Sequence, residues 1–240
     1  MPANTLNNQK TENIKGSLAA LLNQLKAEKI KFNELVEFAG GRLHLHFHFD
    51  IGSINKGIAI LEKIKFASAD DFNSVKKLKE AELFFLKKDG LKAFKFPDYK
   101  SQINPMLLTY ADIDIQLDVL SKKSEELLCR NPNLAAWEAK YLIFDFRNLN
   151  RWYFEEKKLT EEEYKSRALH IIDETRPVLE QHLGFKEILV NLLLLIATLG
   201  IAPSINKAVN DHFLFFQKNY GAKQLDAISQ ILITANQLSP

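Results

Sequence analysis

The sequence predicts a mainly α-helical protein, a helical bundle preceded by a small N-terminal α+β region with one or two short strands. Three observations lead to this fold class. Gly and Pro number only 9 and 7 among 240 residues, which favours long helices over a fold with many turns. Apolar residues recur three and four positions apart over most of the chain. The apolar and charged fractions, 46% and 26%, are those of a globular protein able to bury a core.

The N-terminal region, residues 1–103, opens with an amphipathic helix. Its apolar residues lie three and four positions apart and share one face: Ile14, Leu18, Leu21, Leu22 and Leu25. A short second helix is predicted to follow. Phe32 and Asn33 resemble a hydrophobic staple and an N-cap, and Gly40 and Gly41 are expected to end the helix.

Residues 42–50 alternate strictly between polar and apolar side chains, reading Arg-Leu-His-Leu-His-Phe-His-Phe-Asp. A period of two is typical of a β-strand with one buried face, so this segment predicts the first strand. Residues 91–96 are predicted as a second short strand that follows a turn at Asp89 and Gly90. The two strands would form a hairpin-like pair.

Two helices and a linker complete the N-terminal region. The first helix is predicted from four apolar residues at helical spacing: Ile54, Ile58, Leu61 and Ile64. Ser68 and Asp71 resemble a capping box for the next helix, which runs through Leu86. Residues 97–104 read as a linker, so we place the boundary between two domains after residue 103.

The C-terminal region, residues 104–240, is predicted as a helical bundle. Asn104 and Pro105 form an N-cap and first-turn signal, and Asn131 and Pro132 repeat it. The first helix has an apolar face that steps by four and three: Met106, Tyr110, Ile113, Leu117, Leu120, Ser124 and Leu127. The second continues the stepping: Leu134, Trp137, Tyr141, Phe144 and Asn148. The short connection predicts an antiparallel hairpin whose apolar faces shield each other from water.

Further helices follow. Thr160 and Glu163 resemble a capping box that opens a helix, which Pro177 is expected to kink or restart. Residues 185–199 form a nearly apolar helix, shorter than the roughly 18 residues that span a bilayer. It is therefore interpreted as a buried core helix, with a helix in the membrane interface as the alternative. The last two helices are expected around 204–215 and 222–236.

The predicted strand contains three of the six histidines, His44, His46 and His48. Neutral imidazole is a ligand for zinc and similar ions. Residues two apart on a strand share a face at a separation of about 6.6 Å, so two of the three could hold one ion. A further ligand would come from His170, His182 or a carboxylate. The alternatives are a polar face in water and a partner-binding or pH-sensitive face.

Other candidate reactive groups have competing structural interpretations. Asp112, Asp114 and Asp118 suit acid–base work or Mg²⁺ binding, but also a solvated helix face, which we favour. Cys129, the single cysteine, excludes an internal disulfide. It lies at a predicted helix C-terminus, where the dipole disfavours a thiolate, so a structural role is favoured over a nucleophilic one. Neither a glycine-rich phosphate loop nor a Gly-x-Ser-x-Gly elbow is present.

The net charge of +2 is too small to indicate a nucleic-acid partner. A basic stretch over residues 76–100 interleaves lysines with Phe84, Phe85, Phe94 and Phe96. Such a pattern binds RNA or anionic lipid, and peripheral membrane association is the corresponding alternative. Acidic residues dilute the charge of this stretch, so we interpret it as a solvated helix with a core-facing side.

The C-terminal quarter has a distinctive order of residues. Residues 176–182 read Arg-Pro-Val-Leu-Glu-Gln-His, and residues 188–201 are almost wholly apolar. Residues 212–216 read His-Phe-Leu-Phe-Phe, and Lys223 and Leu225 follow. Over its full extent this pattern resembles a C-terminal helical module found in many Legionella proteins that the Dot/Icm type IV secretion system injects into host cells.

The resemblance covers about residues 176–232 and implies a translocated virulence effector, made in the bacterial cytoplasm and delivered into the host cytoplasm. It implies no activity and carries no catalytic residues, because the module accompanies unrelated functional domains. The chain departs from the pattern at Pro203, where those proteins more often continue the apolar stretch. This departure shortens the apolar helix and weakens any membrane role.

Three functions remain open at this stage. The first is a non-enzymatic protein–protein interaction module that binds a host protein, or another effector, through its helical surface. The second is a metal-dependent enzyme that uses the face formed by His44, His46 and His48, with zinc as the expected ion. The third is a membrane-surface adaptor that uses the basic aromatic stretch or the apolar helix.

Overall fold

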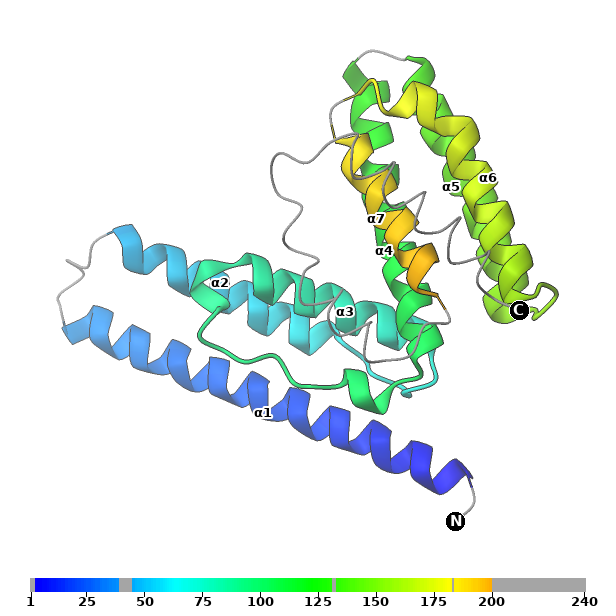
Figure 1. Ribbon diagram of the computed structural model, residues 1–240. Helices are drawn as coiled ribbons and strands as arrows, with labels where there is room; N and C mark the ends of the chain where they lie inside the picture. The colour runs from blue at the N-terminus through cyan, green and yellow to red at the C-terminus, as the bar shows by residue number, and fades with distance from the viewer. Residues whose placement is uncertain (1–2, 39–44, 131–132, 183, 200–240) are drawn as a thin grey trace. The chain divides into compact units, whose positions relative to one another are not determined.

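The chain is mainly helical, as predicted (Figure 1). The computed structural model describes residues 3–38, 45–130, 133–182 and 184–199. The chain divides into two compact units, unit 1 (residues 1–111) and unit 2 (residues 112–240). Helix α4 (Pro105–Arg130) begins in unit 1 and continues into unit 2. The boundary predicted after residue 103 therefore falls in the segment directly before α4.

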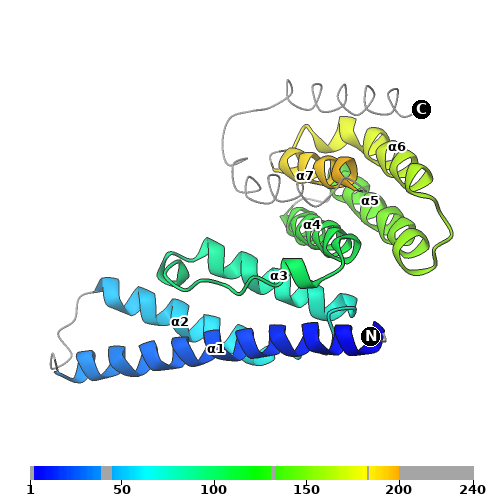
Figure 2. The ribbon, with the colours of Figure 1, turned by 60° about the horizontal axis from the view of Figure 1, so that its bottom comes forward.

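The described part of unit 1 consists of three helices, two short turns of 3₁₀ helix and the start of α4. These elements are α1 (Ala3–Phe38), α2 (Leu45–Lys63), α3 (Phe72–Lys87), η1 (Asp89–Leu91) and η2 (Lys100–Gln102). Helices α1 and α2 lie alongside each other in both views (Figures 1 and 2). Asp71 caps α3, since its carboxylate accepts a hydrogen bond from the Ser74 N–H at 2.7 Å.

The core of unit 1 confirms the helical spacing predicted for α1, α2 and α3. Each helix contributes the apolar residues of one face, among them Ile14, Leu18, Leu21, Leu25, Ile54, Ile58, Leu61, Val75, Leu78 and Phe85. Burying one such side chain stabilises the fold by about 1.5–3 kcal/mol. The face that a helix turns inward is therefore decided by where these residues fall.

The predicted β element is wrong wherever the structure describes it. Residues 45–50 form the first turns of α2, and residues 42–44 lie outside the described part of the chain. Residues 91–96 form the end of η1 and a loop rather than a strand. A single strand leaves its backbone N–H and C=O groups unpaired, and 91–96 was the only predicted neighbour. Instead, Phe96 packs edge-on against Phe85, with 5.3 Å between ring centroids.

Two further predictions for unit 1 are corrected. Helix α1 continues through Asn33 to Phe38, so no second helix starts there. The expected linker is part of the core, because Tyr99 and Ile103 are both buried. The Tyr99 hydroxyl donates a hydrogen bond to Glu82 Oε2 at 2.7 Å, which ties this segment to α3.

In its described residues, unit 2 contains the rest of α4 and four further elements: α5 (Leu134–Asn150), a turn of π-helix η3 (Arg151–Glu155), α6 (Glu161–Leu179) and α7 (Phe185–Thr198). The N-cap of α5 is Asn133, whose side-chain oxygen accepts a hydrogen bond from the Ala136 N–H at 3.0 Å. Residues 131–132, where a start signal was predicted, lie outside the described residues. The capping box of Thr160 and Glu163 is confirmed. Pro177 does not interrupt α6, which continues to Leu179.

Helices α4 and α7 supply much of the core of unit 2. The apolar face predicted for α4 is confirmed at Ile113, Leu117, Leu120 and Ser124, which are all fully buried. The N-cap of α7 is Gly184, whose φ of +88° is a backbone conformation that glycine adopts without strain. Its apolar side chains are mostly buried, in agreement with the prediction of a core helix. The helices expected around 204–215 and 222–236 lie outside the described residues.

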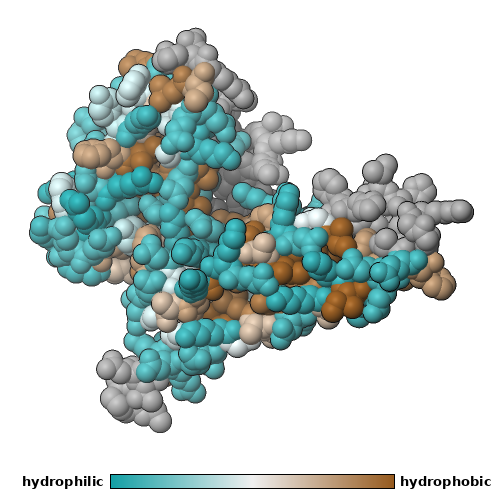
Figure 3. All heavy atoms as spheres, turned by 180° about the vertical axis from the view of Figure 1, so that it is seen from behind, coloured by the Kyte–Doolittle hydropathy of each residue, from teal (hydrophilic) through white to brown (hydrophobic). Residues whose placement is uncertain are grey.

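None of the helices in the described ranges is long and apolar enough to cross a membrane. Hydrophilic residues dominate the face seen in Figure 3, and hydrophobic residues lie on it in separate patches. Most single exposed apolar residues of this kind need no special explanation. A row of exposed apolar residues along one helix does need an explanation, and α5 has such a row.

Candidate interaction surface

Helix α5 exposes four large hydrophobic side chains along one face, which we call the α5 stripe. Their exposed fractions are 62% for Leu134, 51% for Trp137, 62% for Tyr141 and 66% for Phe144. The residues follow each other at intervals of three, four and three, so they lie in one row along the helix. The same residues were predicted to face α4 in the core, and that prediction is wrong.

The opposite face of α5 is the packed one. Its buried residues are Ala135, Ala136, Ala139, Leu142, Ile143, Phe146, Leu149 and Asn150. Three alanines in the first two turns let a neighbouring helix approach closely, and α6 is the helix that lies against α5. Leu142, Phe146 and Leu149 then supply the apolar bulk. The helix therefore has two apolar faces, and the one with small residues near its start is turned inward.

Arg147, at the edge of the packed face of α5, forms ion pairs with two aspartates of α4. Its guanidinium Nη2 donates to Asp118 Oδ1 at 2.8 Å, and its Nε lies 3.9 Å from Asp114 Oδ1. Two of the three aspartates considered as catalytic or Mg²⁺-binding groups therefore share one arginine. This arrangement favours the structural interpretation of the aspartate row.

A buried polar contact holds the C-terminal end of α5. The Tyr164 hydroxyl of α6 lies 2.7 Å from Asn150 Oδ1 and donates a hydrogen bond to it. Tyr164 also stacks on Tyr153 of η3, with 4.6 Å between ring centroids. Burial, followed by the nearby charge of Glu161, raises the pKa of Tyr153 above its ordinary value. These contacts join the C-terminal end of α5 to η3 and α6.

Opposite charges border the two sides of the α5 stripe. Glu138 and Asp145 lie along one edge, and Lys140 and Arg147 lie along the other. Lys140 Nζ is 5.4 Å from the centroid of the Trp137 ring, a cation–π distance. Within the described residues no ion pair involves Glu138, Lys140 or Asp145. The stripe is therefore an apolar row with one acidic and one basic margin.

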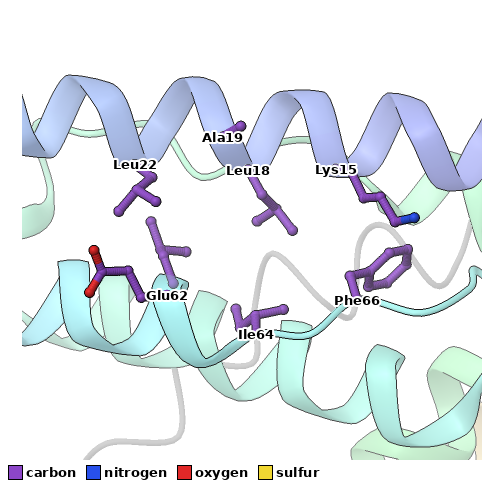
Figure 4. A pocket seen from close by; sticks show the side chains of 8 residues that line it. Lys15, Leu18, Ala19, Leu22, Glu62, Ile64 and Phe66 are labelled. Carbon is purple, nitrogen blue, oxygen red and sulfur yellow. The ribbon is translucent and has the colours of Figure 1, made fainter.

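Unit 1 contains a separate groove between α1 and the end of α2, with a volume of about 420 Å³. Leu18 and Leu22 reach from α1 toward Ile64 and Phe66, as Figure 4 shows. Lys15 and Glu62 are the charged residues in its lining, and Glu62 already pairs with Lys26 at 2.8 Å. The groove has few polar groups that could orient a ligand, so it is a gap in helix packing rather than a built site.

The histidine cluster is described only in part. His46 and His48 belong to the backbone of α2, whereas His44 and all three side chains lie outside the described part of the chain. Positions two apart on a helix are separated by roughly 200° around its axis, so the shared strand face on which the zinc prediction depended is lost. Among the side chains that are described, no three potential ligands come together at a metal-binding distance.

The remaining candidate residues are also placed. Cys129 is exposed near the end of α4. Phe84, Phe85, Phe94 and Phe96 of the basic stretch all pack on or in the core of unit 1. The interpretation of that stretch as a solvated helix with a core-facing side therefore fits the structure.

Sequence reasoning missed that the α5 stripe, the candidate interaction surface, faces outward. The alanines at 135, 136 and 139 were the available signal, because they mark a second face suited to helix packing. Comparison with protein-family models, with curated proteins and with solved structures finds no match to this chain.

Proposed function

We propose that this chain is a non-enzymatic interaction protein that binds another protein through the α5 stripe. The observation that carries this proposal is the row of four exposed hydrophobic side chains, three of them aromatic, on a helix whose other face is fully packed. A binding partner that covers these exposed rings would remove their apolar surface from water, which favours binding.

The composition of the surface favours a protein partner. Trp and Tyr are enriched at the centres of protein interfaces, where they bury large areas with little loss of side-chain entropy. Charged residues border the apolar row on both sides, as at the rim of an interface. The spacing of the stripe matches the intervals of three and four at which helices pack, so an amphipathic helix is the partner element that fits it best.

The resemblance of residues 176–232 to the Dot/Icm effector module supports a biological setting for this activity. In that setting the protein is made in the bacterial cytoplasm, passes through the type IV secretion system and acts in the host cytoplasm. Its partner is then a host protein or another effector. The proposal uses no metal ion and no membrane contact, since no observation among the described residues favours the zinc enzyme or the membrane adaptor.

The test is a quantitative pull-down from host-cell lysate with the full-length chain and two variants. The double substitution Trp137→Ser and Tyr141→Ser removes the centre of the stripe. Leu86→Ser is the matched control, because Leu86 is an exposed apolar residue at the end of α3 and outside the stripe. Circular dichroism checks that all three chains remain folded.

We expect one protein to be captured in stoichiometric amount by the wild type and by the control but not by the stripe variant. The same protein, once purified, should bind the wild type directly. Equal capture by all three chains would contradict the proposal, and so would repeated failure of the wild type to capture any protein.

A further inference from the structure

We propose that, when no other partner is bound, the α5 stripe pairs with the same stripe of a second copy of the chain, with the two helices parallel. This inference rests on the proposed function for the identity of the binding surface. It adds that a second copy of the chain can occupy the α5 stripe, so that self-association competes with binding of another protein.

The spacing of the stripe is that of a two-helix interface. Leu134 and Tyr141 fall at the first position of successive heptads, and Trp137 and Phe144 at the fourth. Two heptads are too short to hold an isolated pair of helices together. Helix α5 is already folded against α6 and η3, so its ordering is complete before a second copy arrives.

Asn148 continues the first-position series one heptad after Tyr141 and is half-buried. Within the described residues its side-chain amide has no hydrogen-bond partner. In a parallel pair, identical first positions face each other, so Asn148 would lie opposite its own copy. A single asparagine at this position fixes the register of two parallel helices.

The charged margins select the same orientation. A parallel pair places the basic margin of one helix against the acidic margin of the other, so that Lys140 meets Asp145 of the second copy twice per dimer. An antiparallel pair would place Glu138 against Asp145 and Lys140 against Arg147, which are like charges. The surface is therefore complementary to itself only in the parallel arrangement.

The area involved fits a weak, reversible dimer. An aromatic side chain carries roughly 150–250 Å², so three rings exposed by half to two thirds present about 350 Å². With Leu134 and the charged margins, two copies would bury on the order of 1,200 Å² in total, the low end of specific interfaces. A dimer of this strength can be displaced by a better-fitting partner.

The experiment is sedimentation equilibrium of the full-length chain over roughly 1–200 µM, a range that brackets a micromolar dissociation constant. The wild type and the Leu86→Ser control should dimerise with the same dissociation constant. Lys140→Glu alone and Asp145→Lys alone should each weaken the dimer by at least about tenfold, because each creates two like-charge contacts. An equimolar mixture of the two variants should recover dimers, since both of its contacts join opposite charges.

Recovery in the mixture separates pairing from misfolding, because a damaged fold would not be repaired by mixing. A wild type that stays monomeric over the whole range overturns the inference, and so does a dimer that ignores both charge reversals. If the chain is monomeric, acrylamide quenching of the Trp152→Phe variant, in which Trp137 is the only tryptophan, measures whether Trp137 is exposed to water. Shielding of Trp137 in that monomer would mean that the chain covers its own stripe, which also overturns the inference.

These outcomes leave the proposed function separately testable. A monomeric chain whose capture of a partner still depends on the stripe would retain the proposed function and reject self-pairing. A dimer that follows the charge rules, with no stripe-dependent partner, would do the reverse.

Discussion

Tyr164 of α6 donates a hydrogen bond to Asn150 Oδ1 over 2.7 Å, and Asn150 is only 1% exposed. Asn150 lies on the side of α5 opposite to Tyr141, so this contact fixes the rotation of α5 about its own axis. The α5 stripe faces outward because Asn150 and the alanines face inward. The orientation of the candidate interface therefore depends on interactions that lie in the core of unit 2.

Replacing Tyr164 by Phe should lower the free energy of unfolding by about 1–3 kcal/mol, because Asn150 Oδ1 is then buried without its donor. Asn150 Nδ2 is already buried without a partner. The double variant Tyr164→Phe, Asn150→Leu should consequently be more stable than Tyr164→Phe alone. Urea unfolding of the single and double variants measures both effects. A single variant as stable as the wild type would show that the hydrogen bond does not hold α5.

The packed face of α5 should reject larger side chains. Ala139→Leu is expected to lower the free energy of unfolding by about 1–3 kcal/mol, because Ala139 is fully buried on the packed face of α5. Phe144→Leu is the control on the exposed face and should change stability by less than about 0.5 kcal/mol. Thermal unfolding of both variants checks the assignment. The reverse order of effects would mean that the two faces of α5 have been exchanged.

The ion pair between Arg147 and Asp118 should contribute little to stability despite its short distance. Its side chains are 49% and 41% exposed, so water screens the attraction. A double-mutant cycle with Arg147→Ala and Asp118→Ala should give a coupling energy of about 0.2–1 kcal/mol. The cycle would be measured by urea unfolding at low and high salt. A coupling above about 2 kcal/mol, unaffected by salt, would contradict this expectation.

The capping box of α6 should make stability depend on pH. The backbone N–H of Thr160 donates to Glu163 Oε2 at 2.8 Å, which lowers the pKa of Glu163 below its ordinary value of 4.5. A lowered folded-state pKa stabilises the protein above the unfolded-state pKa, and the effect disappears as the pH falls through the folded-state pKa. Glu163→Gln should therefore melt below the wild type at neutral pH and approach it in acid. A melting difference that stays constant from pH 7 to pH 3 would argue against a role for the carboxylate charge.

Helical spacing predicted most of the fold because a helix with a single apolar face can bury that face in only one way. The face of α4 that includes Ile113 and Leu117 is buried as its spacing predicted, so prediction and structure agree there. Helix α5 has two apolar faces. Local sequence does not decide between them, because the choice depends on how closely other parts of the chain can pack over Ala135 and Ala139.

The strand predicted over residues 42–50 is helical in its described part, residues 45–50, for a related reason. Residues that alternate between polar and apolar share a face only if the backbone is extended. An extended backbone in turn needs a neighbouring strand to pair with. Residues 91–96 do not provide one, since Phe94 and Phe96 pack on the core as part of a loop. The zinc ligands His44, His46 and His48 stay a prediction, and their proposed spacing depended on that strand.

Hydroxyl-radical footprinting of the full-length chain, at a concentration low enough to keep it monomeric, tests the outward direction of the α5 stripe most directly. The account predicts fast oxidation of Trp137, Tyr141 and Phe144, slow oxidation of the buried Phe146 and Tyr164, and protection of the first three when a protein partner or excess chain is added. Fast oxidation of Phe146 together with slow oxidation of Trp137 and Tyr141 would contradict it.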